Sequence, residues 1–307
     1  MHIGFKTGPR TWEEGKRIVI EEGAKLCEVW FRIDKASDYT EMLDWLTAQG
    51  VSVGLHHWGL VDGRYKTNIA SKNTNIRQKT LQQIKDTIDI GARIECAYVN
   101  MHCGAQAIEE TSFEPTRQVL LTDWRAEKTE AETIFFESMA YLSSYAKERG
   151  VLLTVETLPG LEARDTRLNT YDPGNTSYKS ILEAGRHGSF IANDITHTAT
   201  QLFLEDTNLQ TTWEKLMAFS QAAAPFTRLL HINTVSEPFL GVDSHDGLLP
   251  ADFARNVFPS RQQIKQFLAL FAGRDDVFVI PEPHDHMQEN YQALVQLVSE
   301  VQYPHEV

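Results

Sequence analysis

Phe190-Ile191-Ala192-Asn193-Asp194-Ile195-Thr196-His197 is the stretch that decides the fold. Its apolar start is typical of a short buried strand, which ends at Asn193-Asp194. Asp194 and His197 would then lie on the turn that leaves the carboxyl end of this strand, where both can face one cavity. An Asp-x-x-His spacing alone is a weak signal, but other apolar runs in the chain also end in His, Glu or Asp.

Strand-like and helix-like segments alternate along the whole chain. Apolar runs predict strands at residues 2–6, 26–32, 51–55, 96–101, 151–155, 190–194, 228–233 and 277–280. Helical periodicity follows them at residues 11–23, 39–49, 75–91, 126–149, 177–185, 213–224, 260–272 and 287–301. Eight strand-then-helix units predict a parallel sheet closed into a (β/α)8 TIM barrel. The sequence contains no linker-like or low-complexity segment, so we predict a single domain over residues 1–307.

The connections differ in length at the two ends of the predicted barrel. Helix-to-strand turns such as Gln49-Gly50 are short, whereas the strand-to-helix loops at 104–125, 157–176 and 233–259 are long. In a TIM barrel these loops form the C-terminal rim, where active sites are built. Long loops without secondary structure of their own are usually functional or disordered. Because these loops follow His and Glu residues at strand ends, we expect a functional rim.

The amino-acid composition indicates the cellular compartment of the protein and the kinds of partner that it can bind. The formal net charge of −13 argues against a general nucleic-acid coat, which would present a basic surface, but a local basic groove could still bind nucleic acid as a substrate. Cys27, Cys96 and Cys103 form no CxxC motif, and the N-terminus lacks the apolar core of an export signal. No window approaches the ~18 apolar residues of a membrane helix. We therefore predict a cytoplasmic protein that does not bind membranes, and the sequence leaves its oligomeric state open.

Imidazoles and carboxylates recur at the ends of the predicted strands and in the loop after the seventh. They are His57, His102, Glu156, Asp194, His197, His231, Asp243, His245 and Glu282. One histidine at a strand end is most often a polar residue with satisfied hydrogen bonds. Successive strand ends that all carry such groups instead predict a metal site, suited to Zn²⁺, or to Mn²⁺ where oxygen ligands predominate.

The order of these residues resembles endonuclease IV, of the xylose isomerase-like superfamily of TIM barrels. The matching pieces are His57, His102-Cys103-Gly104, Glu156-Thr157, Asp194-x-x-His197, His231-Ile232-Asn233, Pro238-x-Leu240-Gly241-x-Asp243-x-His245 and Glu282. The resemblance implies two or three Zn²⁺ ions and hydrolysis of a phosphodiester or phosphate ester, with abasic-site DNA as one substrate. Whether His56 or His57 faces inward depends on the pleat of the strand, and the motif alignment selects His57.

The resemblance also implies a role for each residue. His57 and His102 would bind one metal, with Glu156 as a bridge to a second metal held by Asp194, His231 and Glu282. A third metal would be bound by His197, Asp243 and His245. Metals a few ångströms apart activate a bridging water and stabilise the attacking and leaving oxygens of phosphoryl transfer. Glu156 and Glu282 are therefore the predicted catalytic residues, and Glu282 would orient the water or take its proton.

The sequence also departs from that family and leaves two alternatives open. Ile3-Gly4-Phe5-Lys6-Thr7-Gly8 replaces the family's Gly-Ala-His-Val-Ser type opening, and the loop after Glu156 is long and polar. Arg164 and Arg167 in that loop, with Lys66, suit a small phosphorylated or sugar substrate better than damaged duplex DNA. One alternative is a sugar or sugar-phosphate isomerase or epimerase that uses one Mn²⁺ or Mg²⁺ and paired glutamates. The other is a metal-binding module without catalysis.

Overall fold

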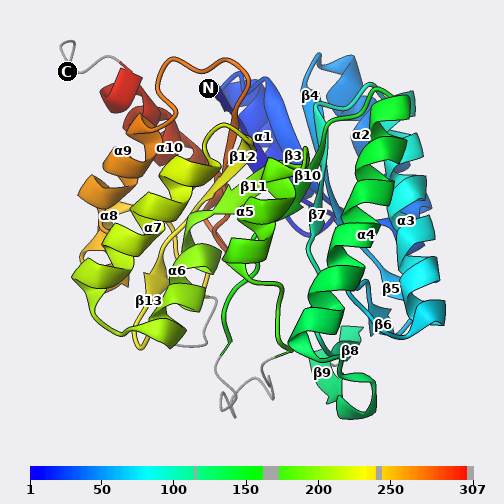
Figure 1. The fold of residues 1–307 in the computed structure, drawn as a ribbon. Helices are drawn as coiled ribbons and strands as arrows, with labels where there is room; N and C mark the ends of the chain where they lie inside the picture. The colour runs from blue at the N-terminus through cyan, green and yellow to red at the C-terminus, as the bar shows by residue number, and fades with distance from the viewer. Residues whose placement is uncertain (114–115, 162–172, 240–243, 303–307) are drawn as a thin grey trace.

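The computed structural model describes residues 1–113, 116–161, 173–239 and 244–302 (Figure 1). Its central sheet has nine parallel strands in the order β1-β15-β12-β11-β10-β7-β4-β3-β2. These strands are β1 His2–Ile3, β2 Phe5–Thr7, β3 Leu26–Arg32, β4 Ser52–Trp58, β7 Tyr98–His102, β10 Leu153–Glu156, β11 Phe190–Asp194, β12 Thr227–Ile232 and β15 Phe278–Pro281. β1 pairs with β15 and β2 pairs with β3, so the two halves of the first predicted strand join the ends of the sheet. The predicted (β/α)8 barrel is confirmed.

Helices surround the sheet, as Figure 1 shows. They are α1 Trp12–Glu21, α2 Thr40–Ala48, α3 Thr74–Arg93, α4 Lys128–Glu148, α5 Tyr178–Arg186, α6 Ile195–Glu205, α7 Leu209–Ala223, α8 Pro250–Phe253, α9 Arg261–Ala269 and α10 Met287–Gln302. In α3, for example, Ile76, Ile84 and Ile88 are buried at helical spacing, which fixes the face turned to the sheet. Within the described residues, none of the helices is long and apolar enough to cross a membrane.

Two small antiparallel sheets build up the C-terminal rim, at the lower end of Figure 1. One has the order β5-β6-β8-β9, from β5 Leu60–Val61, β6 Tyr65–Lys66, β8 Ile108–Phe113 and β9 Thr116–Leu121. The other pairs β13 Val235–Ser236 with β14 Val257–Phe258. The loops at 104–125 and 233–259 were predicted as irregular connections, and these strands give parts of both a regular structure.

An apolar plug closes the interior of the barrel below the rim. It is a separate cluster of buried side chains from five strands, namely Leu26, Tyr98, Ala192, Leu229 and Ile280. Glycines complete this layer, because a Cβ atom on Gly54 would lie 2.3 Å from the Tyr98 ring. A Cβ atom on Gly4 would lie 2.7 Å from Leu26 and 2.8 Å from Ile280. Strand side chains alternate between faces, so residues two positions after the plug lie in the next layer toward the rim.

Candidate active site

A polar layer follows the plug on every strand of the barrel. Two residues after the plug position, the strands carry Lys6, Glu28, His56, Asn100, Glu156, Asp194, His231 and Glu282. All eight side chains are buried. Buried charges in proteins are stable only when they are paired or bind a metal, so this layer is the candidate active site.

Four residues of this layer form a group of metal-ligand type. The ligand atoms of Glu156, Asp194, His231 and Glu282 all lie within 4.8 Å of one another. Nδ1 of His231 lies 3.1 Å from Glu156 Oε1, 2.9 Å from Glu282 Oε2 and 3.9 Å from Asp194 Oδ2. Among the described residues, the buried Asp194 Oδ2 has no hydrogen-bond partner, and the buried Glu282 Oε2 has none beyond its close approach to Nδ1 of His231. A divalent cation would satisfy these oxygens, and three carboxylates with one imidazole suit Mn²⁺ or Zn²⁺.

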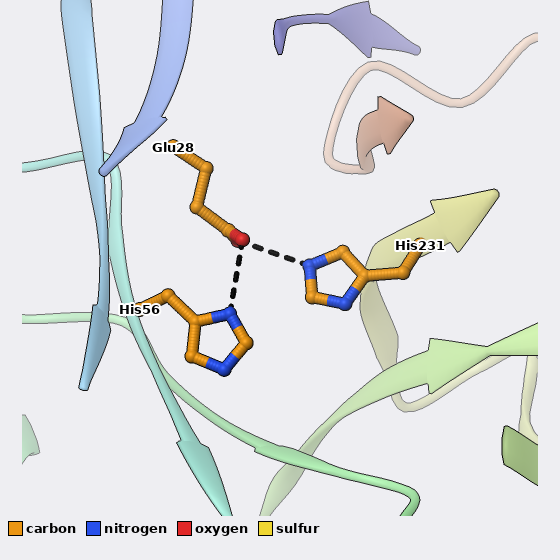
Figure 2. Close-up of side chains that lie close together, drawn as sticks. All are labelled: Glu28, His56 and His231. Carbon is orange, nitrogen blue, oxygen red and sulfur yellow. Dashed lines mark hydrogen bonds and ion pairs between the residues drawn. The ribbon is translucent and has the colours of Figure 1, made fainter. Parts of the chain in front are cut away.

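Glu28 orients the imidazole of this group. Figure 2 shows Glu28 between the rings of His56 and His231, and its Oε2 lies 3.1 Å from Nε2 of His231. Tyr98 donates its hydroxyl to the same oxygen at 3.0 Å. A carboxylate on the far nitrogen of a histidine fixes the ring and its tautomer in many metal sites. Here it leaves Nδ1 of His231 facing the three carboxylates of the four-residue group.

The charges of the layer shift its pKa values strongly. Burial lowers the pKa of His231, but Glu28, Glu282 and Glu156 outweigh burial and raise it well above its ordinary value. Burial raises the pKa of Glu156, but His231 and His56 outweigh it and hold that pKa well below the usual range. His231 and Lys6 likewise lower the pKa of Glu282 against the effect of burial. Both glutamates are therefore ionised.

The structure places His56 inside the barrel and His57 outside it. Nε2 of His56 lies 3.1 Å from Nε2 of His102 and 3.3 Å from Oε2 of Glu156, and these three residues form a second group of metal-ligand type. His57 points toward α3, where its Nδ1 lies 2.8 Å from the hydroxyl of Thr87. Burial, followed by the nearby His56, lowers the pKa of His57 to about 3. The prediction that His57 faces the site is wrong, because alternation along β4 gives the inward position to its neighbour.

Asp194 and His197 are brought together as the opening stretch predicts. Oδ1 of Asp194 accepts hydrogen bonds from the backbone nitrogens of Thr196 at 2.8 Å and His197 at 2.9 Å, so this residue also caps α6. The cap places Nδ1 of His197 3.3 Å from Oε1 of Glu156. The ring of His245 lies 5.5 Å from that of His197, and Asp243 lies outside the described residues.

Lys6 is a functional candidate that the motif alignment missed. Its ammonium bonds to Glu282, lies 3.1 Å from Oε1 of Glu28 and 2.8 Å from Nδ1 of His56, and sits 4.7 Å above the Trp30 ring. Burial lowers its pKa, but Glu282, Glu28 and Glu156 outweigh burial and raise it above the usual lysine range. Lys6, Glu28 and His56 share one place in the barrel, because each stands two positions after a residue of the plug layer, and only the structure identifies that layer.

A cavity of about 170 Å³ opens above the polar layer. His102, Glu156, His197 and Glu282 line its inner end, and Trp30, Trp58, Lys66 and Glu109 line its walls. Lys66, a predicted substrate-binding residue, lies at the cavity with its ammonium 2.9 Å from the Glu109 carboxylate. The other two predicted substrate-binding residues, Arg164 and Arg167, lie outside the described residues.

Comparison with known proteins gives the family. A family model described as "Xylose isomerase-like TIM barrel" matches residues 17–245. The chain belongs to this family. The match covers the strands that carry Glu28, His56, His102, Glu156, Asp194 and His231, and it ends at His245. No curated protein matches the chain by sequence.

Solved structures of similar fold include proteins described as sugar epimerases. A D-tagatose 3-epimerase-like protein has 14% identity and a TM-score of 0.67, with 100% of each chain covered. D-psicose 3-epimerase from Clostridium cellulolyticum, in complex with D-tagatose, has 13% identity and a TM-score of 0.59, covering 98% of this chain and 96% of that one. A Thermus thermophilus protein, TTHB071, soaked with ZnCl2, has 16% identity and a TM-score of 0.62, covering 98% of this chain and 99% of that one. At such identities these likenesses show the fold alone.

Proposed function

We propose that this protein is a metal-dependent isomerase or epimerase that acts on a small sugar. The observation that carries the proposal is the placement of Glu156 and Glu282. One oxygen of each carboxylate lies close to Nδ1 of His231, at 3.1 and 2.9 Å, and both residues line the small cavity. Two ionised carboxylates that reach one substrate from different strands can remove a proton from carbon and return it on the other face.

The residues of the polar layer divide the work of such a reaction. Glu156, Asp194, His231 and Glu282 would hold the cation, and Glu28 would keep the imidazole aimed at it. A bound divalent cation would supply Lewis-acid polarisation of the carbonyl and hydroxyl oxygens of the substrate. Glu156 and Glu282 would each accept or return the proton. Asn100 donates its amide to Oε2 of Glu156 and would fix the direction in which that carboxylate faces.

The cavity supports a small hydroxylated substrate. Its volume of about 170 Å³ is below the roughly 300–1,000 Å³ of sites for drug-sized ligands, so it suits a small molecule and not a duplex, which needs an open groove. Trp30 and Trp58 provide apolar faces, while Lys66 and Glu109 provide polar atoms to bind hydroxyl groups. The D-psicose 3-epimerase of similar fold is described in complex with D-tagatose, a ketose of this class. The net charge of −13 also opposes binding to a polyanion.

One observation favours a second candidate, hydrolysis of a phosphodiester or phosphate ester. His56, His102 and Glu156 form a further group of metal-ligand type, which shares Glu156 with the first. Adjacent metals with a shared carboxylate are typical of enzymes that hydrolyse phosphate esters. This candidate requires at least two cations per chain and activity on abasic duplex DNA or a smaller ester, and the isomerase requires one cation.

The test is a parallel assay of both chemistries on protein reconstituted with Mn²⁺ or Zn²⁺. Ketoses and aldoses are incubated in D2O, and NMR follows both epimerisation and deuterium incorporation at carbon. An abasic duplex and a chromogenic phosphodiester are assayed beside them. We expect the wild type to turn over a sugar with deuterium uptake. The turnover rate should fall by at least ~100-fold in Glu156→Gln and Glu282→Gln. The surface control Glu183→Gln should keep the wild-type rate. Phosphodiester cleavage without turnover of any sugar would overturn the proposal.

A further inference from the structure

The position of Lys6 bears on how many cations the site can hold. Its ammonium lies 2.8 Å from Nδ1 of His56 and 3.1 Å from Oε1 of Glu28, and it also bonds to Glu282. A lysine ammonium has three N–H donors and no acceptor. Oε1 of Glu28 also lies 3.1 Å from Nδ1 of His56, but the ammonium can donate to this oxygen and to the nitrogen at once. The shorter contact, to a group that can only donate, therefore assigns Nδ1 of His56 as an acceptor without a proton.

The tautomer of His56 follows from this contact. A neutral imidazole with a bare Nδ1 carries its proton on Nε2. Nε2 of His56 is the nitrogen that faces His102 at 3.1 Å and Glu156 at 3.3 Å. A nitrogen that bears a proton cannot bind a metal, since metal ligands must be deprotonated. With Lys6 in place, the group of His56, His102 and Glu156 is therefore joined by hydrogen bonds and does not offer a set of three ligands.

Removal of Lys6 would reverse the tautomer. Oε1 of Glu28 lies 3.1 Å from Nδ1 of His56, as the dashed line in Figure 2 marks. Without the ammonium, this carboxylate would accept a proton carried on Nδ1, as its other oxygen faces Nε2 of His231. Nε2 of His56 would then present a lone pair toward His102 and Glu156. The carboxylate–histidine arrangement that prepares His231 for a metal would then prepare His56 as well.

The net charge of the polar layer also opposes the binding of a second cation. Four buried carboxylates, those of Glu28, Glu156, Asp194 and Glu282, face the centre of the barrel. With neutral histidines, the Lys6 ammonium and one divalent cation leave a single negative charge. A second divalent cation beside Lys6 would make this buried site net positive, which is unfavourable without further anions.

We propose that Lys6 is a specificity-determining residue that limits this site to one divalent cation. It does so by holding His56 in the tautomer that cannot bind a metal and by supplying part of the positive charge that a second cation would bring. The inference rests on the proposed one-cation isomerase and concerns the number of metals. It also names the residue that separates this site from the multi-metal hydrolase geometry that the remaining ligands would allow.

The experiment counts the metal ions bound per chain of 307 residues. Chelator-treated protein is equilibrated with MnCl2 or ZnCl2, separated from free metal by gel filtration and analysed by plasma mass spectrometry. We expect one equivalent per chain for the wild type, two for Lys6→Met and one again for Lys6→Met/His102→Ala. Electron paramagnetic resonance of the Mn²⁺-loaded Lys6→Met variant should show two coupled ions. The variant Lys16→Met, which loses an ion pair with Glu13 and a contact with the Trp12 ring but touches no residue of the polar layer, should match the wild type.

A variant that retains Lys6 tests the same inference if Lys6→Met does not fold. His102→Ala alone should leave the metal count at one, because His102 binds no cation while Lys6 is present. Two or more equivalents in the wild type, a loss of one equivalent in His102→Ala, or a folded Lys6→Met variant that still binds one metal would each overturn the inference. Sugar turnover by a protein with two cations would sink this inference and leave the proposed function standing. A protein that binds one cation but turns over no sugar would contradict the proposed function and leave this inference standing.

Discussion

Oε2 of Glu28 lies 3.1 Å from Nε2 of His231, on the side of the ring opposite the four-residue metal group. Glu28 comes from β3 and His231 from β12, so the contact crosses the interior of the barrel. It fixes which nitrogen of His231 faces Glu156, Asp194 and Glu282. The geometry makes Glu28 a positioning residue, although it does not belong to the four-residue group itself.

The first prediction concerns Glu28→Gln. The amide keeps the size of the side chain but removes the negative charge that favours a proton on Nε2 of His231. We expect the affinity for Mn²⁺ to fall by about 10–100-fold, the usual effect of losing such a partner, while one equivalent still binds at saturation. Calorimetric titration measures both quantities. Unchanged affinity in a folded Glu28→Gln protein would show that Glu28 does not orient the ligand.

The second prediction separates the two roles of Asp194. Its Oδ1 caps α6 through Thr196 and His197, and its Oδ2 has no hydrogen-bond partner among the described residues. Asparagine is as good a cap as aspartate, and alanine is a poor one. Asp194→Asn should therefore lose metal affinity and retain the cap, whereas Asp194→Ala should lose both.

In metal-free protein, Asp194→Ala should be about 1 kcal/mol less stable than Asp194→Asn in urea unfolding. Both variants should bind Mn²⁺ much more weakly than the wild type. Equal stability of the two metal-free variants would contradict the capping role. Wild-type affinity in Asp194→Asn would contradict the role as a ligand.

The third prediction follows from the buried, outward-facing His57. Its pKa is lowered from 6.5 to about 3 by burial and by His56, so the unfolded chain binds one more proton than the folded chain between these values. Its contribution to stability is fully present above about pH 6.5 and is lost as the pH falls toward 3, with a slope of at most about 1.4 kcal/mol per pH unit. His57→Gln should make the free energy of unfolding depend less on pH over this range.

Metal content gives the control for His57. Because its side chain lies against Thr87 on α3, His57→Gln should bind as much Mn²⁺ as the wild type. A lost equivalent would show that His57 turns inward after all. A pH dependence of unfolding identical to the wild type would instead mean that His57 is not the group titrating over this range.

The fourth prediction tests the packing beneath the site. A Cβ atom on Gly54 would lie 2.3 Å from the Tyr98 ring, whose hydroxyl bonds to Glu28. Gly54→Ala should cost about 1–3 kcal/mol of stability, because a packed core does not accept an extra methyl group. Gly8→Ala is the matched control, since its Cβ atom would meet nothing closer than 3.5 Å. Chemical denaturation compares the two, and equal stabilities would contradict the tight packing of the plug.

Much of the barrel could be predicted from the sequence, because its signals are local. Each strand is a short apolar run, and each helix repeats apolar residues at its own period. His102, Glu156 and Asp194 were predicted as ligands because each ends its strand, and the structure places each in a group of metal-ligand type. The antiparallel sheet β5-β6-β8-β9 was missed in part because β6 pairs with β8, which lies far away in the chain, and no local pattern records that pairing. Its β5-β6 and β8-β9 pairs are local hairpins between short strands.

The errors in the site come from the pleat of the strands. A shift of one residue along a strand moves a side chain to the other face, and motif alignment cannot see that phase. His57 was therefore chosen in place of His56. Glu28 was overlooked because it lies inside its predicted strand, and Lys6 was overlooked because only imidazoles and carboxylates were sought at the strand ends. Counting two positions on from Gly4, Leu26 and Gly54 finds all three inward residues, but those plug positions are known only once the barrel is seen.

The most direct measurement is anomalous diffraction from crystals grown with Mn²⁺, recorded on both sides of the manganese absorption edge. The account predicts one strong anomalous peak between Glu156, Asp194, His231 and Glu282, and no second peak beside His56 and His102. An absent peak at the four-residue group, at saturating Mn²⁺, would contradict the proposed metal centre and the chemistry built on it.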